Sequence, residues 1–500
     1  MLVASGCSSE PRGASQTSAA GEAPNTPEAQ GIDSNQLASV IDQIVAQHLD
    51  VHSLTVFRHG HVVLDADFFP YDGRRRHDFA SCTKALTTTA LGIALDDGSI
   101  PNLDQALLSY FPDTVVDNDS TDKRAMTLAQ AASMTSGFDC VNQPNELTLI
   151  QMQAAPDWMK FALGVPMAGP PGTEWRYCST AMHILSGVIG HVTGQAEDDF
   201  LAERLFAPIG ASRPEWPRDP QGNTHGWGDA RLWPKDMLRV AQVFLGQGTF
   251  GTQRIVDSSF VAEATSNRAG DLGPPNGYGY AWWTTSGKSY YAQGRGGQLV
   301  LIAPVRGAIL VVTGAQSSDQ TQSLNDLVNE LGAKLSDSPL PPDPEAVRKL
   351  SAEVTKVSEP PAAEAVPPPP DTASTVSGRT YALASNMFGW DSVELTFAES
   401  EATLTLAMGS TKTTAKIGLD AVARITRDAQ FSTDPRYADI DIAMSGKWTA
   451  DDTFVVTFDT IDTIDAGTMS FVFQNDDLTV SIFEKTFLLS TITFGGQAKR

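Results

Sequence analysis

The sequence predicts a mixed α/β region followed by a smaller all-β region. Two runs, Leu299–Ile302 and Ala308–Val312, are continuously apolar, as expected of strands that helices cover on both faces. Between Leu103 and Leu245 the pattern is mostly helical, with many turns. Beyond Gly378 apolar residues recur at every second position, which indicates antiparallel strands. The chain therefore contains two folded regions of different class.

Composition narrows the classes of partner. The chain has 500 residues, of which 41% are hydrophobic, enough for two or three domains with real cores. A net charge of −24 disfavours nucleic acid and anionic membrane surfaces, since both attract Lys and Arg. No apolar run reaches the about 18 residues of a membrane span, and no metal-ligand spacing is present. We expect a small-molecule partner and neither a metal nor a cofactor.

The N-terminus resembles the end of a bacterial lipoprotein signal. Small residues precede Cys7, and a stretch rich in Ser, Gly, Ala, Pro and Thr continues to Gln30, as suits a tether. The charged and most of the apolar part of such a signal are missing. The segment 1–30 predicts lipidation of Cys7 and a place in the bacterial cell envelope, lipid-anchored, periplasmic or secreted. The alternative is a disordered N-terminus in which Cys7 is incidental.

Residues 31–340 are predicted to form the α/β domain. Ser34 can cap a first helix, and the hairpin 53–68 follows, with His59-Gly60-His61 at its tip. Further strands are expected at 278–283 and 289–292, and a further helix at 324–331. The remaining apolar strands and the helical stretch complete a sheet with helices on either side.

A second domain is predicted after a change in composition. Residues 341–377 read as a semi-rigid linker because most of this stretch is rich in Pro, Ala, Ser and Glu. Residues 378–500 form an antiparallel sandwich or barrel. No group of residues in it suggests chemistry. We interpret it as a structural or docking appendage, with a lid that shapes the substrate site as the alternative.

The strongest chemical signal is a Ser-x-x-Lys tetrad at the start of an apolar helix. Ser81 precedes the uncharged run 85–95, so its hydroxyl meets unpaired backbone N–H groups, and Lys84 lies one turn on. This arrangement favours a serine nucleophile with a lysine base. The alternative is an ordinary helix start that Ser81 caps, with Lys84 incidental, since it would have the same sequence. A second tetrad, Ser120 to Lys123, lies in an Asp-rich setting that we interpret as a solvated loop.

Two later stretches can complete such a site. Tyr177 follows a Pro-Pro-Gly turn and precedes an apolar helix; beside a lysine its pKa should fall, so that it could relay a proton. The run 294–298, Gly-Arg-Gly-Gly-Gln, opens a strand and lets a ligand approach the backbone, where an N–H could hold an oxyanion. Core packing for the tyrosine and a tight turn for the glycines are the alternatives. The four cysteines predict no disulfide framework, and a single bridge stays open.

The order of these motifs resembles the superfamily of penicillin-binding proteins and serine β-lactamases. More narrowly, it is similar to the class C-related hydrolases that include esterases and 6-aminohexanoate-dimer hydrolases. The resemblance covers roughly residues 37–335. Supporting stretches are Leu95–Ile100, Met126–Leu128, Met134–Gly137, Pro171–Ser179, Leu205–Gly210 and Tyr278–Tyr280.

The resemblance implies an α/β fold with an antiparallel sheet and an all-helical subdomain, with the site between them. It implies Ser81 as nucleophile, Lys84 as base and Tyr177 as proton relay. It also implies an oxyanion hole from the N–H groups of Ser81 and Gln298, with substrate-binding residues that lie near it: Gly297, Arg295 and Ser179. Ser179 stands where the family usually has Asn, and Arg295 stands where lactam-binding members have Lys. Both departures disfavour β-lactam processing.

The sequence therefore predicts a serine hydrolase that forms an acyl-enzyme on Ser81 and acts on small esters, amides or peptide-like molecules. One alternative is D,D-peptidase, penicillin-binding or β-lactamase activity. The other is a non-catalytic envelope-binding protein on the same scaffold. Membrane contact is expected only through the lipid anchor.

Overall fold

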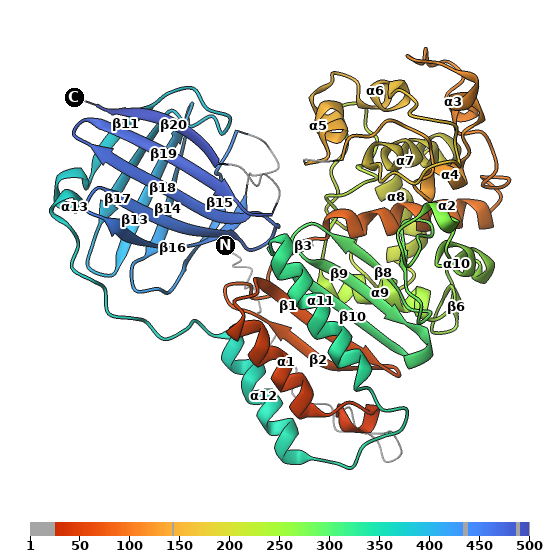
Figure 1. Ribbon diagram of the computed structural model, residues 1–500, viewed down its shortest axis with the longest axis horizontal. Helices are drawn as coiled ribbons and strands as arrows, with labels where there is room; N and C mark the ends of the chain where they lie inside the picture. The colour runs from red at the N-terminus through yellow and green to blue at the C-terminus, as the bar shows by residue number, and fades with distance from the viewer. Residues whose placement is uncertain (1–25, 143–144, 434–438, 487–490, 500) are drawn as a thin grey trace, which may run out of the picture.

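The computed structural model describes residues 26–142, 145–433, 439–486 and 491–499. It contains an α/β domain and a β-barrel domain that lie side by side (Figure 1). Cys7 and most of the predicted tether lie outside the described residues, so the lipidation site stays a prediction.

A six-stranded antiparallel sheet forms the centre of the α/β domain. Its strand order is β2-β1-β10-β9-β8-β7, and every neighbouring pair is antiparallel. The strands are β1 (Val51–Arg58), β2 (His61–Asp67), β7 (Trp283–Thr284), β8 (Tyr290–Gly294), β9 (Gln298–Ala303) and β10 (Ala308–Gly314). β1 and β10 are buried along their whole length, because helices cover both faces. The predicted hairpin is confirmed as β1–β2, whereas most of the predicted strand 278–283 is buried loop.

Three helices cover one face of this sheet: α1 (Ser34–Ala46), α11 (Ser318–Ala333) and α12 (Pro344–Ser358) (Figure 1). Their apolar side chains share one core with β1 and β2. Asp33, and not the predicted Ser34, caps α1, since its side chain accepts a hydrogen bond from Asn35 N at 2.8 Å. Ser34 is already the first helical residue and is buried.

α12 corrects the predicted linker 341–377. Pro344 begins this helix, and Asp343 caps it. Ala346, Leu350 and Val354 recur at a spacing of four, so they form an apolar stripe that packs against α1 and β2. The stretch is rich in Pro and Ala, and for this reason the helix was not predicted from the sequence. Only residues 359–370 lack regular structure before the short helix α13 (Asp371–Val376).

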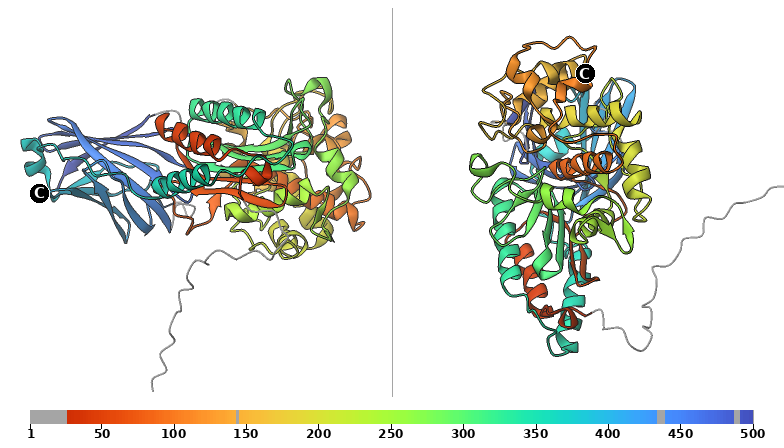
Figure 2. Two further views of the ribbon diagram at one scale, coloured as in Figure 1. Left: turned by 90° about the horizontal axis from the view of Figure 1, so that it is seen from below. Right: turned by 90° about the vertical axis from the view of Figure 1, so that its right-hand side faces the viewer.

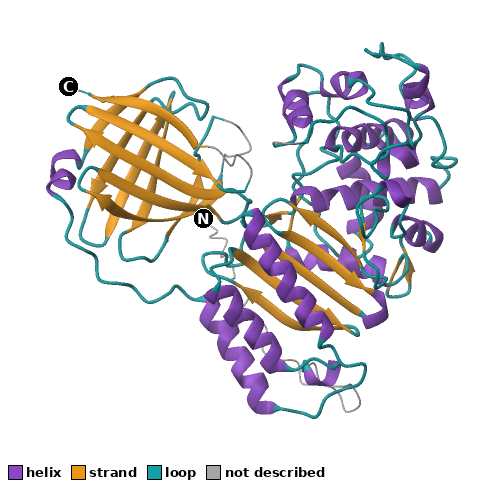
Figure 3. Ribbon diagram, viewed as in Figure 1, coloured by secondary structure: helices purple, strands orange, loops and turns teal. Residues whose placement is uncertain are grey.

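Helices cover the opposite face of the sheet and extend into a helical subdomain (Figure 3). They are α2 (Thr83–Asp96), α3 (Thr121–Ala125), α4 (Leu128–Ala132), α5 (Leu147–Ala154), α6 (Trp158–Gly164), α7 (Ser179–Thr193), α8 (Glu197–Leu201), α9 (Pro234–Leu245) and α10 (Ser258–Ala264). Small pairs of strands, β3 (His77–Asp78) with β4 (Arg231–Leu232) and β5 (Thr249–Phe250) with β6 (Gln253–Arg254), tie loops together. α2 is buried from Thr83 to Ala94, as the uncharged run 85–95 predicted, and it packs against α7.

The C-terminal domain is a barrel, which decides between the two predicted β architectures (Figure 2). Ten strands form one sheet, and a pairing between β14 and β16 joins its two sides. The strands are β11 (Arg379–Leu383), β12 (Ser392–Phe397), β13 (Glu401–Met408), β14 (Thr411–Gly418), β15 (Arg424–Ala429), β16 (Ile440–Ala450), β17 (Thr453–Thr460), β18 (Ala466–Gln474), β19 (Asp477–Glu484) and β20 (Thr491–Ala498). Alternate side chains fill its core, as the period of two requires.

Within the described parts of the chain, no helix combines the length and apolar character that a membrane crossing needs. The same residues contain no group of three or more His, Cys, Asp or Glu side chains arranged to hold a metal ion.

Candidate active site

Ser81 lies in a short turn that leads into α2. β3 ends at Asp78, a 3₁₀ turn spans Ala80–Cys82, and α2 begins at Thr83. Ala80 adopts a left-handed conformation with φ of 45°, and its N–H donates to Asp78 Oδ1 at 2.7 Å. The aspartate therefore stabilises an unfavourable backbone conformation that presents the Ser81 side chain.

Lys84 is buried, and its ammonium nitrogen reaches the Ser81 hydroxyl. Lys84 Nζ is 2.8 Å from Ser81 Oγ and also donates to Trp227 O at 2.8 Å. Burial lowers the pKa of Lys84 to about 8, although the charges of Glu146 and Asp229 act in the opposite direction. The neutral amine, which can accept a proton, is thus accessible near neutral pH.

Tyr177 completes this cluster. Its ring centroid is 4.8 Å from Lys84 Nζ. Burial raises the pKa of Tyr177 well above its usual range, and the nearby Ser81 side chain opposes this only in part. The predicted lowering of this pKa by Lys84 is therefore wrong, because desolvation of the phenolate is the larger effect. The phenol stays protonated, which suits a hydrogen-bond donor.

Three aromatic side chains form a cluster with Tyr177. Trp283 stacks on Tyr177 with centroids 6.5 Å apart, and Trp175 lies 6.4 Å from it. Tyr278 contacts both tryptophans, at 5.0 and 5.6 Å. These three residues were not among those predicted for the site. The aromatic residues beside Tyr177 and in the run 278–283 were the available signal.

A disulfide anchors the loop that carries Tyr177. Cys140 and Cys178 are bonded, with Cα atoms 5.5 Å apart, so the bridge that the sequence left open is present. Asn142 additionally donates a side-chain hydrogen bond to Tyr177 O. The two cysteines are 38 residues apart, and nothing in their local sequences pairs them. The covalent link holds Tyr177 close to the loop 140–142.

The glycine-rich run forms the hairpin turn between β8 and β9. Gly294 pairs with Gln298, and Gly296 and Gly297 have φ of 76° and 80°. The run therefore forms the tight turn that the sequence allowed as an alternative. Gly294 itself packs against the nucleophile turn, since a Cβ on it would lie 3.0 Å from Ser81 N. A side chain at this position would collide with the backbone of Ser81.

Gln298 lies at the start of β9, and its side chain stabilises the hairpin. Its amide nitrogen donates to Gly314 O at 2.6 Å and to Arg295 O at 3.2 Å. Gln298 O accepts a hydrogen bond from the thiol of Cys82 at 3.6 Å, so the hairpin also contacts the nucleophile turn. Burial raises the pKa of that thiol, as expected for an inert structural cysteine. The role of the Gln298 N–H as an oxyanion donor stays a prediction.

Arg295 and Ser179, two predicted substrate-binding residues, have other surroundings. Arg295 Nη1 donates to Asp465 Oδ1 at 3.1 Å and to Thr486 Oγ1 at 2.7 Å, both in the barrel domain. Ser179 is the first residue of α7 and is buried, and its hydroxyl oxygen has no hydrogen-bond partner. Neither side chain is brought to Ser81 by a contact that the structure shows.

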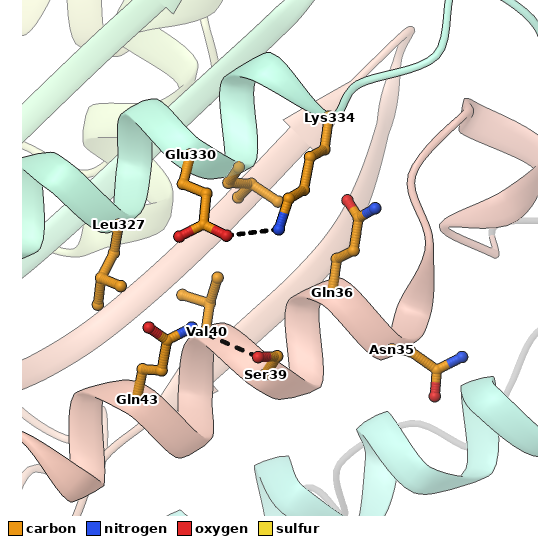
Figure 4. Close-up of a pocket in the computed structure, with 9 residues that line it drawn as sticks. Asn35, Gln36, Ser39, Val40, Gln43, Leu327, Glu330 and Lys334 are labelled. Carbon is orange, nitrogen blue, oxygen red and sulfur yellow. Dashed lines mark hydrogen bonds and ion pairs between the residues drawn. The ribbon is translucent and has the colours of Figure 1, made fainter.

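Two hollows lie away from Ser81. One, of about 170 Å³, lies between α1 and α11; Figure 4 shows it lined by polar side chains and by the Lys334–Glu330 ion pair. The other, of about 900 Å³, lies between the proline run 367–369 and the barrel strands near Trp448. Neither is lined by a serine in contact with a lysine, whereas Ser81 and Lys84 make such a contact.

This architecture defines a class of protein. An antiparallel sheet with a helical subdomain and a Ser-x-x-Lys turn at the start of a buried helix is the arrangement of β-lactamase-fold serine hydrolases. Residues 37–333, more than half of the chain, match the family model described as Beta-lactamase. The chain belongs to this family, as the resemblance predicted.

Individual relatives are distant. Penicillin-binding protein 4 from Amycolatopsis lactamdurans is 25% identical over 309 residues, which are 52% of this chain and 79% of the relative. The structure of a provisionally named 6-aminohexanoate-dimer hydrolase from Bacillus anthracis superposes with a TM-score of 0.52 at 18% sequence identity. The match covers 60% of this chain and 83% of the hydrolase chain. A provisionally named β-lactamase from Bacteroides dorei superposes with a TM-score of 0.50 at 16% sequence identity, and the match covers 60% of this chain and 98% of the β-lactamase chain. At such identities the two structures show the shared fold.

Proposed function

We propose that this protein is a serine hydrolase that forms an acyl-enzyme on Ser81 and hydrolyses small esters or amides. The observation that carries the proposal is the 2.8 Å contact between Lys84 Nζ and Ser81 Oγ, made by a buried lysine whose pKa is lowered to about 8. A nucleophile and a base within hydrogen-bond reach are the minimum that acyl transfer needs.

Acylation begins with neutral Lys84. One of its N–H groups donates to Trp227 O, which leaves the lone pair free to accept the proton of Ser81 Oγ. The Ser81 oxygen then bonds to the substrate carbonyl carbon. Tyr177, protonated at neutral pH and adjacent to Lys84, is suited to pass a proton to the leaving group, which departs as an alcohol or amine. The proton held by Lys84 replaces the one that Tyr177 gives up.

Backbone N–H groups hold the oxyanion in this proposal. Ser81 N is one donor, and a second comes from the strand end 294–298, where Gly294 packs against Ser81. Such donors stabilise the charge that develops on the carbonyl oxygen, and each is worth roughly 10²- to 10³-fold in rate. Water then attacks the acyl carbonyl carbon while Lys84 accepts its proton. The bond from that carbon to Ser81 Oγ breaks, Lys84 returns the proton to Oγ, and the carboxylic acid product leaves.

The surroundings of the site favour small esters over β-lactams. The guanidinium of Arg295 binds the barrel domain, and the hydroxyl of Ser179 is buried, so neither is presented to a substrate carboxylate or amide. The aromatic side chains Trp175, Tyr278 and Trp283 offer an apolar surface beside Tyr177. We expect turnover of short-chain p-nitrophenyl esters and at most trace turnover of cephalosporins.

The test is an intact mass after treatment with a fluorophosphonate. A stoichiometric adduct that maps to Ser81 and disappears in Ser81→Ala supports the proposal. The absence of an adduct at every pH tried would favour a non-catalytic envelope-binding protein on the same scaffold.

A second candidate is penicillin binding or D,D-peptidase activity, which the distant relative named penicillin-binding protein 4 favours. Labelling with a fluorescent penicillin separates the two. Cephalosporin turnover with kcat/KM equal to that of the best ester would replace the esterase assignment with that of a β-lactamase.

For localisation we propose the cell envelope. The Cys140–Cys178 disulfide supports an oxidising compartment outside the cytosol. The tether and Cys7 further suggest a lipid anchor. Expression from an upstream start, followed by fractionation of wild type and Cys7→Ala, tests the anchor: only the wild type should remain with the membrane, and an unmodified Cys7 would contradict it.

A further inference from the structure

The turn between β17 and β18 of the barrel domain is buried in the contact with the α/β domain. Ile461, Asp462, Thr463 and Ile464 expose only 2 to 3% of their surface. A turn between two strands ordinarily faces solvent. Here it reaches the α/β domain, because Asp78 N donates to Asp462 O at 3.3 Å.

The same turn touches both backbone segments that frame Ser81. Asp78, which accepts the hydrogen bond of Ala80 N, is one of them. The hairpin turn after Gly294 is the other: a Cβ on Gly296 would lie 3.1 Å from Ile464 Cβ. The barrel domain thus contacts the entry to the nucleophile turn and the strand end that packs against Ser81 N.

Arg295 links this hairpin turn to two separate elements of the barrel. Its guanidinium bonds Asp465 after β17 and Thr486 after β19. Thr486 is itself fixed, since its N–H and hydroxyl both donate to Glu484 Oε1, at 2.7 and 2.6 Å. Arg295 is 30% exposed and Asp465 14%, so solvent screens this pair only in part.

The hairpin turn needs such support. Gly296 and Gly297 both have left-handed backbone conformations. Glycine adopts this conformation easily but can also adopt many others, so the two residues by themselves do not restrict the turn to one conformation. Within the α/β domain, two hydrogen bonds hold the backbone of the turn: the Gln298 side chain donates to Arg295 O, and Gln316 N donates to Gly296 O at 3.0 Å. Neither of them holds the Arg295 side chain, which the barrel domain binds. Oxyanion stabilisation requires donors fixed within a few tenths of an ångström, so a loosely held turn would lose rate.

We propose that the barrel domain positions the oxyanion-binding hairpin of the α/β domain, with Asp465 and Thr486 acting through Arg295 as positioning residues. The inference rests on the proposed hydrolase function. It assigns Arg295 a bracing role in place of substrate-carboxylate binding, and it assigns the C-terminal domain a part in the catalytic step.

The experiment compares ester hydrolysis by wild type, Asp465→Ala and Thr486→Val in the full chain. We expect kcat to fall about tenfold in Asp465→Ala and less in Thr486→Val, with KM almost unchanged, because a misplaced donor weakens only the transition state. Arg295→Lys, which retains a cation for Asp465, should keep more activity than Arg295→Ala.

Asp428→Ala is the matched control. It removes another interdomain Arg–Asp pair, that of Arg75 with Asp428, which does not involve the hairpin turn. Its kcat should equal that of wild type. An equal loss in Asp428→Ala and Asp465→Ala would mean that only domain association matters and would overturn the inference. A rise in KM with kcat unchanged in Asp465→Ala would overturn it too, since it would indicate substrate binding.

Thr486→Val keeps the test decisive if Asp465→Ala does not fold, because it removes one hydroxyl and preserves side-chain shape. The inference fails if wild type is labelled on Ser81 by fluorophosphonate while both variants turn over esters at the wild-type rate. The proposed function itself fails if wild type is not labelled. The two failures are therefore distinguishable.

Discussion

The chain contains two Ser-x-x-Lys tetrads, Ser81 to Lys84 and Ser120 to Lys123, which have the same spacing but different structures. Both lysines are buried. Lys84 Nζ contacts Ser81 Oγ, whereas Lys123 Nζ donates to Asp117 O and Leu163 O, each at 2.9 Å. In the second tetrad the lysine amine therefore binds two backbone carbonyl groups and not the serine hydroxyl.

The serines explain the difference. Ser120 caps α3, and its hydroxyl accepts a hydrogen bond from Lys123 N at 3.1 Å. The Asp-rich residues 117–119 are the exposed loop that was predicted, but the tetrad itself enters the short helix α3, in which Lys123 is buried. Ser81 makes no such cap; Ala80 in a left-handed conformation turns the chain before α2, so the hydroxyl meets Lys84. One spacing thus yields either a helix cap or a nucleophile–base pair.

The largest expected contrast comes from removing each hydroxyl. Ser81→Ala should lower kcat for p-nitrophenyl esters by at least about 10³-fold, because the nucleophile is lost. Ser120→Ala should leave kcat unchanged and reduce the free energy of unfolding by about 1 kcal/mol, the usual value of an N-cap. Steady-state kinetics and urea denaturation measure both. Comparable activity in the two variants would remove Ser81 from the mechanism.

The lysines give the next contrast. Lys84→Met should reduce kcat by about 10²- to 10⁴-fold with a small change in KM, since general-base catalysis is lost. Lys123→Met should retain kcat but lose about 1 to 3 kcal/mol of stability, because Asp117 O and Leu163 O lose their donor. A kcat for Lys84→Met within about threefold of wild type would contradict the assignment of the base.

Tyr177→Phe tests whether the phenol belongs to the first tetrad. The substitution keeps the ring that stacks on Trp283 and removes only the hydroxyl. We expect kcat to fall about 10- to 100-fold at constant stability. An unchanged kcat would assign Tyr177 to packing, the alternative that the sequence left open.

The pH profile should report Lys84. Burial lowers its pKa to about 8, so the neutral base is fully present above that pH and is lost below it. The kcat/KM value should fall about tenfold per pH unit below about 7 and level off above about 9. Tyr177, whose pKa is raised by burial, should not limit activity in this range. A profile that declines as pH rises through 8 would require protonated Lys84 in the mechanism.

The smallest effect on activity is expected for the disulfide. Cys140→Ser with Cys178→Ser should cost about 2 to 4 kcal/mol of stability, since the unfolded chain gains freedom. The loss in kcat should be only severalfold, because Asn142 and the aromatic neighbours still hold Tyr177. A loss as large as that of Tyr177→Phe would indicate that the covalent link itself positions the phenol.

Local sequence determined the elements whose signals are periodic. The apolar runs of β9 and β10, the uncharged run 85–95 of α2 and the alternating strands of the barrel were all predictable, because burial selects side chains at the period of the element. The family resemblance added the order of the motifs and hence the fold of the α/β domain. Helix α12 was missed because proline and alanine in the surrounding stretch masked its apolar stripe.

Only the tertiary structure decided which of these residues meet. Ser81 and Lys84 are three residues apart, yet the same spacing leaves the Ser120 hydroxyl away from the Lys123 amine, so the turn at Ala80 and not the spacing alone brings the first pair together. Arg295 and Asp465 are 170 residues apart, and the disulfide joins cysteines from two loops, so local patterns carried no information about either pair. The direction of the Tyr177 pKa shift was likewise set by the packing of distant side chains, because desolvation depends on everything that surrounds a group.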